Sequence, residues 1–471
     1  MLSLKVFLEE VSKHIEHDLK AGQIHALEVL HEFFFFGDKQ SAFILLGYAG
    51  TGKTTLMAGL INWLRTHQRK TVLLAPTGRS AKVLSAHSNL PASTIHRRIY
   101  SVKQGDDGRF KMSMARNTSE NTYFIVDEAS MIGGYNADDW QGRSLLDDLI
   151  AYVQSGTKCR IIFIGDDAQL PPVGSDLSPS LNKEEVDIKT GAKTFTAVLT
   201  EVARQQQGSL ILENATTLRD QLNNDSFGQV ELQVDKSEDV VHLDPYDLQD
   251  KLESCLSGSA AQESIIICRS NKEANMFNQQ IRQSIHYRES ILEAGDRLMI
   301  VKNNYFWKLK WQKSAFLANG DMLTVERIHQ VIEVGESKFA EVQIILDGSD
   351  GQEMDMWLFL DPLGAEGPSV SLKQIENLYP LFVSEGLVEA DDPYERFYQS
   401  PFYNAVQVKY AYAVTCHKSQ GGQWKNVFLS AGYLREDMID KSYLRWLYTA
   451  ITRATTNLYL INFPSQMITL K

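Results

Sequence analysis

The sequence lacks the features that would direct it into a membrane or staple it with disulfides. No stretch of its 471 residues approaches the roughly 18 uninterrupted apolar residues that a membrane-spanning helix needs. The first 20 residues mix acidic and basic side chains, unlike the basic-then-apolar pattern of a signal peptide. The four cysteines include no CxxC pair, which argues against a zinc site, an iron–sulfur cluster and a disulfide framework. We therefore expect a cytoplasmic protein in a reducing environment.

Positive charge and flexible linkers are also scarce. Asp and Glu outnumber Lys and Arg by 59 to 47, so the net charge is −12. This balance is unfavourable for a nucleic-acid partner without excluding one, because a groove can be basic on an acidic protein. There is no Pro-rich or Gly/Ser-rich linker, no repeat and no low-complexity segment. The ordinary composition, 43% apolar and 23% charged, and the length together predict two to four globular domains.

Short apolar runs alternate with helical stretches over the first 170 residues. The runs lie at residues 41–49, 71–77, 122–130 and 159–167. Buried strands that alternate with helices predict a parallel sheet covered on both faces. Residues 97–121 interrupt this pattern with a polar insert, in which GDDG at residues 105–108 favours a β-hairpin.

The strand–helix alternation returns near residues 263–285 and again near residues 425–452. Between residues 295 and 400 four runs are instead typical of antiparallel strands with Gly and Asp turns, followed by a helix near residues 371–387. The sequence therefore predicts an α/β fold with two parallel-sheet lobes, the second interrupted by a mostly β insertion.

The run GYAGTGKT at residues 47–54 has the spacing of a phosphate-binding loop. Its glycines would let backbone N–H groups turn toward phosphate oxygens, while Lys53 reaches the β- and γ-phosphates and the Thr54 hydroxyl ligates Mg²⁺. An apolar strand precedes the loop and an amphipathic helix follows it, as such a site requires. The residues expected to bind ATP here are Gly47, Gly50, Thr51, Gly52, Lys53, Thr54 and Thr55.

A second acidic site follows the strand in TYFIVDEAS, where Asp127 and Glu128 lie at the carboxyl end. Asp127 would hold the Mg²⁺ ion and Glu128 would polarise the attacking water, although acids at a strand end can also be helix caps. A third strand ends in GDDAQLPPVG, residues 165–174. Gln169 there could touch the γ-phosphate and a neighbouring element, or it could belong to a plain Pro-rich loop.

These segments, in this order, resemble those of superfamily 1 helicases, and in particular the RecD/Dda-like branch. The likeness extends through AGQIHALEVL at residues 21–30, LLAPTGRSAKVL at 73–84, LTEVARQ at 199–205, AYAVTCHKSQGGQW at 411–424 and LYTAITRAT at 447–455. The resemblance implies two RecA-like lobes, with an SH3-like insertion in the second. It places Gln23 on the adenine, Arg204 at the γ-phosphate and Arg453 as an arginine finger.

The resemblance also implies a single-stranded DNA partner. The residues in its strand-facing motifs are Thr77, Thr94, His96, Thr415, His417 and Lys418. Tyr305, Trp307 and Trp311 are candidates for stacking on bases, with packing in the core as the alternative. The insert at residues 97–121 occupies the position of the branch's strand-splitting pin, but Asp106 and Asp107 make its tip acidic, unlike an aromatic wedge.

The expected domain boundaries follow from these motifs. We expect a first lobe at residues 1–205, a second lobe at 206–294 and 401–471, and the insertion at 295–400. About 20 residues precede the first motif, so we expect no accessory N-terminal domain; residues 175–195 and 385–402 match nothing in the family.

The function expected is that of a monomeric, ATP-dependent DNA helicase with Mg²⁺, moving 5′ to 3′ on single-stranded DNA and acting at junctions with duplex DNA. Two alternatives keep the phosphate loop. One is a translocase that displaces proteins without unwinding, and the other is a non-motor P-loop NTPase whose turnover is indifferent to DNA.

Overall fold

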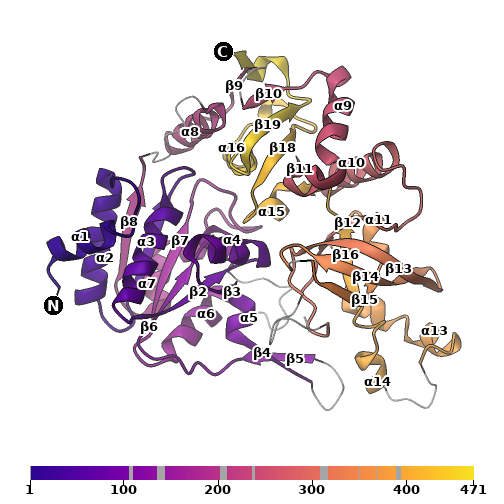
Figure 1. The fold of residues 1–471 in the computed structure, drawn as a ribbon, viewed down its shortest axis with the longest axis horizontal. Coiled ribbons are helices and arrows are strands. Elements are labelled where there is room, and N and C mark those ends of the chain that lie inside the picture. Colours follow the sequence, from indigo (N-terminus) through magenta and orange to yellow (C-terminus); the bar gives the residue numbers. More distant parts are fainter. Residues whose placement is uncertain are drawn as a thin grey trace.

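The computed structural model describes residues 2–104, 110–134, 144–201, 209–235, 239–307, 317–349, 351–367, 369–388 and 394–471. These residues form two parallel sheets covered by helices, together with a closed β-barrel (Figure 1). The α/β fold with two RecA-like lobes is confirmed. Across the described residues, no helix combines the length and apolarity that crossing a membrane requires.

The first lobe is a six-stranded parallel sheet. Its order is β3 (Ala92–Thr94), β2 (Lys70–Ala75), β6 (Thr122–Val126), β7 (Arg160–Gly165), β1 (Ala42–Gly47) and β8 (Thr194–Leu199). Alternate residues of β1 enter different cores, because Phe43 packs on one face of the sheet and Ile44 on the other. Four helices cover the first face: α1 (Leu4–Ser12), α2 (Ala21–Phe36), α3 (Lys53–Thr66) and α4 (Gly78–Ser88). The opposite face is covered by α5 (Ile95–Ile99), α6 (Leu145–Gln154) and α7 (Lys183–Thr190).

The insert in the first lobe is a β-hairpin, as predicted. Its strands β4 (Tyr100–Gln104) and β5 (Phe110–Met114) pair antiparallel, with Tyr100 opposite Met114. They form a separate two-stranded sheet that extends from the first lobe (Figure 1). The tip with Asp106 and Asp107 lies outside the described residues.

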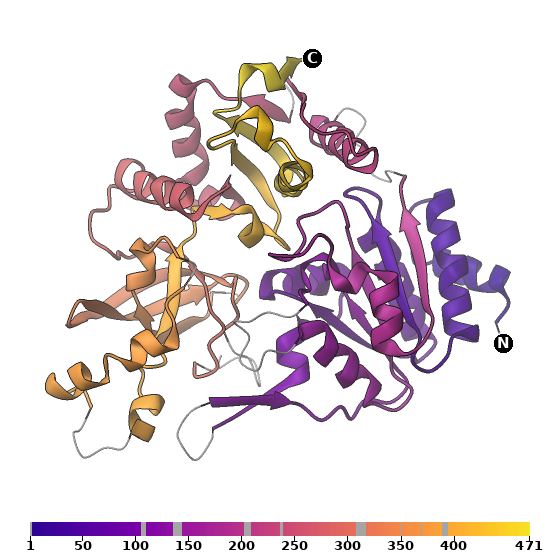
Figure 2. The ribbon, with the colours of Figure 1, turned by 180° about the vertical axis from the view of Figure 1, so that it is seen from behind.

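The second lobe is a five-stranded parallel sheet. Its order is β10 (Val240–His242), β19 (Ala454–Ile461), β18 (Trp424–Ser430), β11 (Ser264–Cys268) and β17 (Ala413–Thr415). Its helices are α8 (Leu210–Asn223), α9 (Pro245–Leu256), α10 (Asn271–Ser284), α15 (Cys416–Ser419) and α16 (Lys441–Ile451). A small parallel pair, β9 (Leu232–Val234) with β20 (Ile468–Leu470), adjoins this lobe near the C-terminus (Figure 2).

The insertion is a closed barrel of β12 (Arg297–Ile300), β13 (Met322–Val334), β14 (Ser337–Leu346), β15 (Glu353–Phe359) and β16 (Val406–Tyr410). The four predicted strands are β12–β15 and pair antiparallel in sequence order. The closing strand β16 follows the expected domain boundary at residue 400. It nevertheless belongs to the barrel, because it pairs with both β12 and β15 before the chain continues into β17. The barrel thus includes a segment that the sequence had assigned to the second lobe.

The helix predicted near residues 371–387 is wrong as a single element. The chain instead forms α12 (Leu372–Glu376) and α13 (Tyr379–Ser384), flanked by α11 (Asp361–Gly364) and α14 (Tyr394–Gln399). Pro380 lies in the first turn of α13, where its missing N–H costs nothing. Inside a continuous helix it would remove a hydrogen bond and clash with the preceding turn.

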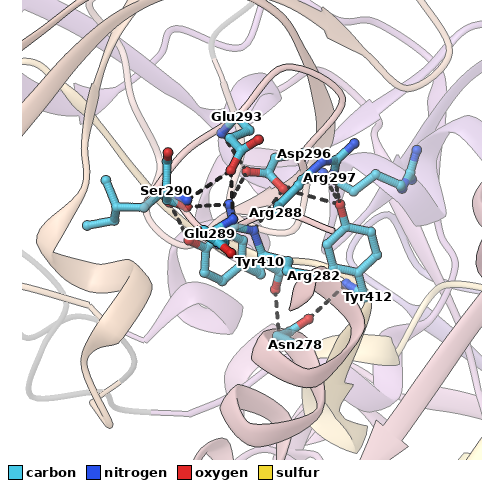
Figure 3. Close-up of polar contacts among 11 residues, drawn as sticks. Asn278, Arg282, Arg288, Glu289, Ser290, Glu293, Asp296, Arg297, Tyr410 and Tyr412 are labelled. Carbon is cyan, nitrogen blue, oxygen red and sulfur yellow. Dashed lines mark hydrogen bonds and ion pairs between the residues drawn. The ribbon is translucent and has the colours of Figure 1, made fainter. Parts of the chain in front are cut away.

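A buried ionic cluster fastens the barrel to the second lobe (Figure 3). Asp296, which is 0% exposed, accepts hydrogen bonds from Arg282 Nε at 2.9 Å, Arg282 Nη2 at 2.9 Å and Arg288 Nη1 at 3.0 Å. The Tyr412 hydroxyl accepts from Arg288 Nη1 at 2.7 Å and from the Arg297 N–H at 3.1 Å. Since Arg282 belongs to α10 and Arg297 begins β12, the cluster fixes the base of the barrel against the second lobe.

Candidate active site

The loop between β1 and α3 has the backbone geometry of a phosphate-binding loop. Gly50 and Gly52 have φ of 78° and 81°, a left-handed conformation that favours glycine. A Cβ on Gly47 would lie 2.9 Å from both Thr51 Oγ1 and Lys53 Cγ, so a side chain there would collide with the loop. Lys53 Nζ donates to the carbonyl oxygens of Gly47 and, at 2.9 Å, Tyr48. Phosphate oxygens could replace these neutral acceptors.

Two carboxylates face this loop from the end of β6. Asp127 Oδ1 accepts a hydrogen bond from the Glu128 N–H at 2.9 Å, and Glu128 has a left-handed φ of 51°. Burial raises the pKa of Asp127 to about 6; the charge of Glu128 acts in the same direction and that of Lys53 opposes it. A further positive charge at this place would stabilise the Asp127 carboxylate.

Sequence reasoning missed Asp166, which directly follows β7. Its Oδ2 lies 4.0 Å from Lys53 Nζ and accepts a hydrogen bond from the Tyr448 hydroxyl at 2.8 Å. The same hydroxyl accepts from the Ala49 N–H of the loop, also at 2.8 Å. An acid at the end of a strand beside a phosphate loop was the available signal for Asp166. Tyr448 gave no signal, because its contacts cross from α16 of the second lobe to the first.

The segment after β7 touches both lobes. Gln169 is 6% exposed, and its Oε1 is buried without a hydrogen-bond partner among the described residues. The next residue, Leu170, donates its N–H to Thr449 Oγ1 at 2.8 Å and accepts from Gln420 Nε2 at 2.7 Å. The unpartnered oxygen of Gln169 is therefore held where the lobes meet.

Arg453 directly precedes β19 and is 3% exposed. Its guanidinium donates to the Thr449 carbonyl at 3.0 Å, the Thr452 hydroxyl at 3.1 Å and the Gly422 carbonyl at 3.4 Å. These acceptors are neutral, so the positive charge of Arg453 is left available to a ligand.

A cavity of about 1060 Å³ between the lobes collects most of the predicted nucleotide residues. Those that line it are Gln23, Gly50, Gly52, Lys53, Thr54, Thr55, Asp127, Glu128, Gln169 and Arg453. Gly47 and Thr51 are not on its wall; the buried Thr51 hydroxyl donates to the Tyr48 carbonyl at 2.8 Å and so shapes the loop. Gln23 Nε2 donates to the Thr51 carbonyl at 3.2 Å. Arg204 lies outside the described residues.

The residues of this cavity fit a magnesium–triphosphate group. Mg²⁺ is commonly bound by one or two protein side chains together with phosphate oxygens, which matches Thr54 and Asp127. The unpartnered oxygen of Gln169 and the raised pKa of Asp127 each indicate a place for a polar or cationic group.

A second cavity, of about 320 Å³, brings together five of the six predicted strand-facing residues: Thr77, Thr94, His96, His417 and Lys418. The sixth, Thr415, is not on its wall. The barrel contributes the loop before β13, including Asn319 and Gly320. Burial lowers the pKa of Lys418 to about 8, with the charge of Lys409 adding to the effect. A phosphate group would stabilise such a poorly solvated ammonium.

Some of these side chains also have structural roles. Thr77 Oγ1 accepts from the Ser80 N–H and caps α4, and Thr94 Oγ1 accepts from the Arg97 N–H and caps α5, each at 3.2 Å. Among the aromatic candidates, Trp307 packs against the barrel cores and donates its Nε1–H to the Asn404 carbonyl at 2.8 Å. Tyr305 reaches the hairpin, with its hydroxyl 3.6 Å from Met112 Sδ. Trp311 lies outside the described residues.

The fold and the cavity together define a P-loop protein with two RecA-like lobes. Two family models match the chain: an AAA domain over residues 18–234 and a UvrD-like helicase C-terminal domain over residues 410–461. The matched segments contain the phosphate loop and Arg453, respectively. The nucleotide cavity thus draws on both matched regions.

Curated relatives narrow the class further. Dda of Enterobacteria phage T4, an ATP-dependent DNA helicase, is 31% identical over 206 residues, which cover 43% of each chain. The ATP-dependent RecD2 DNA helicase of Deinococcus radiodurans is 31% identical over 172 residues, 36% of this chain and 21% of that protein. An uncharacterized protein of Methanocaldococcus jannaschii, MJ1519, is 24% identical over 483 residues, 89% of this chain and 36% of its own length. Each match spans less than half of the relative.

A solved structure of Pif1 helicase from Bacteroides, in complex with ADP-AlF3 and single-stranded DNA, aligns with a TM-score of 0.48 at 15% identity, covering 97% of this chain and 95% of that one. By its motifs, its family matches and its relatives, this chain is similar to the superfamily 1 helicases, in particular those of the RecD/Dda-like group.

Proposed function

We propose that this protein is an ATP-dependent DNA helicase that moves 5′ to 3′ along single-stranded DNA and couples ATP hydrolysis to strand separation. The observation that carries the proposal is the cavity in which Lys53 and Asp127 of one lobe face Arg453 of the other. The likeness to Dda and RecD2, both ATP-dependent DNA helicases, supports the choice of substrate.

In this proposal the chain's own residues prepare the γ-phosphate for attack. Lys53 and the loop N–H groups hold the phosphates, and Glu128 orients the attacking water and accepts its proton. Thr54 and Asp127 would hold Mg²⁺, which when bound neutralises phosphate charge. Arg453, with Arg204, stabilises the negative charge that develops as the bond breaks.

Movement would follow from opening and closing of the cavity. Tyr448 and Arg453 lie on the second lobe and face the phosphate loop, so nucleotide binding would draw the lobes together and hydrolysis would release them. The strand-facing cavity is lined from the first lobe, the second lobe and the barrel. Each cycle would therefore change the grip of one lobe on DNA relative to the other, and a single chain would suffice as the motor.

The hairpin β4–β5 is the proposed strand-separating element. It stands apart from the main sheet and contacts the barrel loop through Met112 and Tyr305. A duplex arriving at the strand-facing cavity would meet the hairpin at this junction.

The test is strand displacement from duplexes that carry either a 5′ or a 3′ single-stranded tail. We expect ATP-dependent displacement from the 5′-tailed duplex alone, and none from either substrate with Lys53→Ala protein. Displacement from the 3′ tail only would contradict the polarity. ATP hydrolysis that single-stranded DNA leaves unchanged would contradict the motor itself.

A further inference from the structure

Arg79 lies between the strand-facing cavity and the nucleotide cavity. It is the second residue of α4 and lines the strand-facing cavity. Its guanidinium carbon lies 3.9 Å from the centroid of the Trp424 ring, and its Nη2 donates to the Gln423 carbonyl at 3.1 Å. Gln423 in turn lines the nucleotide cavity. One side chain of the first lobe thus lines the strand-facing cavity and reaches the nucleotide cavity through Gln423 of the second lobe.

Two glycines let the lobes approach at this point. A Cβ on Gly422 would lie 2.8 Å from Arg79 Nε and 2.5 Å from the Trp424 ring. Gly421 has a φ of 71°, and a Cβ there would lie 2.9 Å from the Ser80 Cβ of α4. The turn before β18 therefore packs against the start of α4 more closely than residues with side chains would allow.

The same turn is bonded to Arg453. The Trp424 N–H donates to the Arg453 carbonyl at 3.0 Å, and Arg453 Nη1 donates to the Gly422 carbonyl at 3.4 Å. Because Arg79 holds the turn from one side and Arg453 holds it from the other, a displacement of α4 would be passed to the Arg453 guanidinium.

The chemistry of the contact depends on the flat guanidinium. Within the part of the chain that the structure describes, no carboxylate lies within 4.0 Å of Arg79, whereas Arg297 is paired with Asp347 at 2.8 Å. The partners of Arg79 are instead an aromatic face, a carbonyl oxygen and Met322 Sδ, which lies 3.3 Å from Arg79 Nη1. Lysine would keep the charge but could not stack in the same way.

We propose that the Arg79–Trp424 stack couples the two cavities, so that DNA in the strand-facing cavity positions Arg453 for ATP hydrolysis. This inference rests on the proposed motor function and deepens it. Arg79 is a positioning residue here, since it acts on the reaction through Trp424 and Arg453.

The experiment measures ATP hydrolysis at saturating ATP over a range of oligo-dT concentrations. It compares wild type with Arg79→Lys, Arg79→Met and Trp424→Leu. We expect all three variants to lower the maximal DNA stimulation at least about fivefold, the lower end of ordinary coupling between sites. The Arg79→Lys/Trp424→Leu double variant should lose little more than the worse single variant, because both changes break one contact.

Arg69→Lys is the matched control. Arg69 precedes β2 at the opposite end of the strand from Arg79, and it lies over the Phe35 and Tyr123 rings at 5.7 and 5.9 Å. The Arg69→Lys variant makes the same chemical change at a stack that is remote from both cavities. DNA should therefore stimulate its ATP hydrolysis as much as that of wild type. Melting temperatures identify any variant that fails to fold. If Trp424→Leu fails to fold, the two Arg79 variants still test the proposal.

Three outcomes distinguish the readings. If Arg79→Lys shifts only the half-saturating DNA concentration and keeps the maximal rate, Arg79 is a phosphate contact and the coupling proposal is wrong. Multiplying effects in the double variant would also overturn it, since the two side chains would then act separately. If oligo-dT leaves wild-type hydrolysis unchanged, the proposed motor function fails instead.

Discussion

Lys53 lies at the wall of the cavity, where its side chain can serve the chemistry of the site without being needed for folding. Its ammonium donates to loop carbonyls at the wall of the cavity, and its side chain is 17% exposed. We expect Lys53→Ala to lower ATP hydrolysis by at least about 100-fold, because a preorganised positive charge at the phosphates is lost. The melting temperature should stay close to that of wild type. As a control, Lys70→Ala at an exposed lysine of the same lobe should change neither the rate of ATP hydrolysis nor the melting temperature. Substantial DNA-stimulated ATP hydrolysis by Lys53→Ala would refute the site assignment.

His96 should make stability depend on pH. Burial lowers the pKa of His96 to about 4, below the value of about 6.5 for an unfolded histidine. Between these values the unfolded chain binds the proton more tightly, so the stabilisation is complete above pH 6.5 and is lost as the pH falls toward 4. Because His96 lines a cavity, we expect a modest effect, about 1–2 kcal/mol between pH 7.5 and pH 5.

The measurement is the free energy of unfolding in urea at these two pH values for wild type and His96→Gln. The variant should lose less stability on acidification, since glutamine does not titrate. An equal loss in both proteins would show that His96 is not the residue responsible.

Among the elements, the hairpin β4–β5 can be removed without disturbing the sheet behind it. Its strands pair with each other, and Ser101 lies directly opposite Ser113. Replacing residues 102–112 with Gly-Gly would close the hairpin early, since two glycines suffice for a tight turn. We expect DNA-stimulated hydrolysis to continue and duplex separation to fall at least about tenfold.

The same two assays provide the check. The control replaces only residues 105–108 with Gly-Gly. This smaller replacement should leave more duplex-separating activity than the replacement of residues 102–112. Full unwinding by the shortened protein would exclude the hairpin as the separating element. Loss of hydrolysis as well would mean that the hairpin supports the motor rather than the junction.

At the scale of single elements, the strand–helix units could be predicted from the sequence. Strands that are buried on both faces are continuous apolar runs, as in β1 and β6. The segment around residues 371–387 was not, since one apolar pattern suits a single helix or two short ones. Pro380 decided between them. The closing strand β16 was likewise assigned to the second lobe instead of the barrel, because the sequence of a strand does not specify which strands it pairs with.

For the whole molecule, the cluster around Asp296 should determine how firmly the barrel is held to the second lobe. Asp296→Asn would leave Arg282, 2% exposed, without its carboxylate. Breaking such a buried pair costs about 3–5 kcal/mol, and we expect the free energy of unfolding in urea to fall by that order.

Glu263→Gln is the matched control, because it breaks the exposed pair between Glu263 and Lys425 at 2.7 Å. Surface pairs contribute about 0–1 kcal/mol, so its unfolding midpoint should hardly move. Equal, small effects in both variants would mean that the cluster does not fasten the barrel.

The sequence by itself determined the phosphate loop, the acids Asp127 and Glu128, and the two-lobe α/β class. These depend on short-range spacing: glycines fix the turn, and burial periodicity fixes strands and helices. The likeness to a known family supplied Arg453 and the strand-facing residues. Their convergence in two cavities came from the tertiary structure.

Only the tertiary structure decided how the cavities are joined. Arg79 and Gln423 are 344 positions apart, and Tyr448 reaches Asp166 from the other lobe. Neither pair has a local pattern, because each contact depends on how two separately folded lobes pack. Gly421 and Gly422 were visible in the sequence as part of a motif, but the start of α4 lying against them gives the physical reason for glycine at both positions.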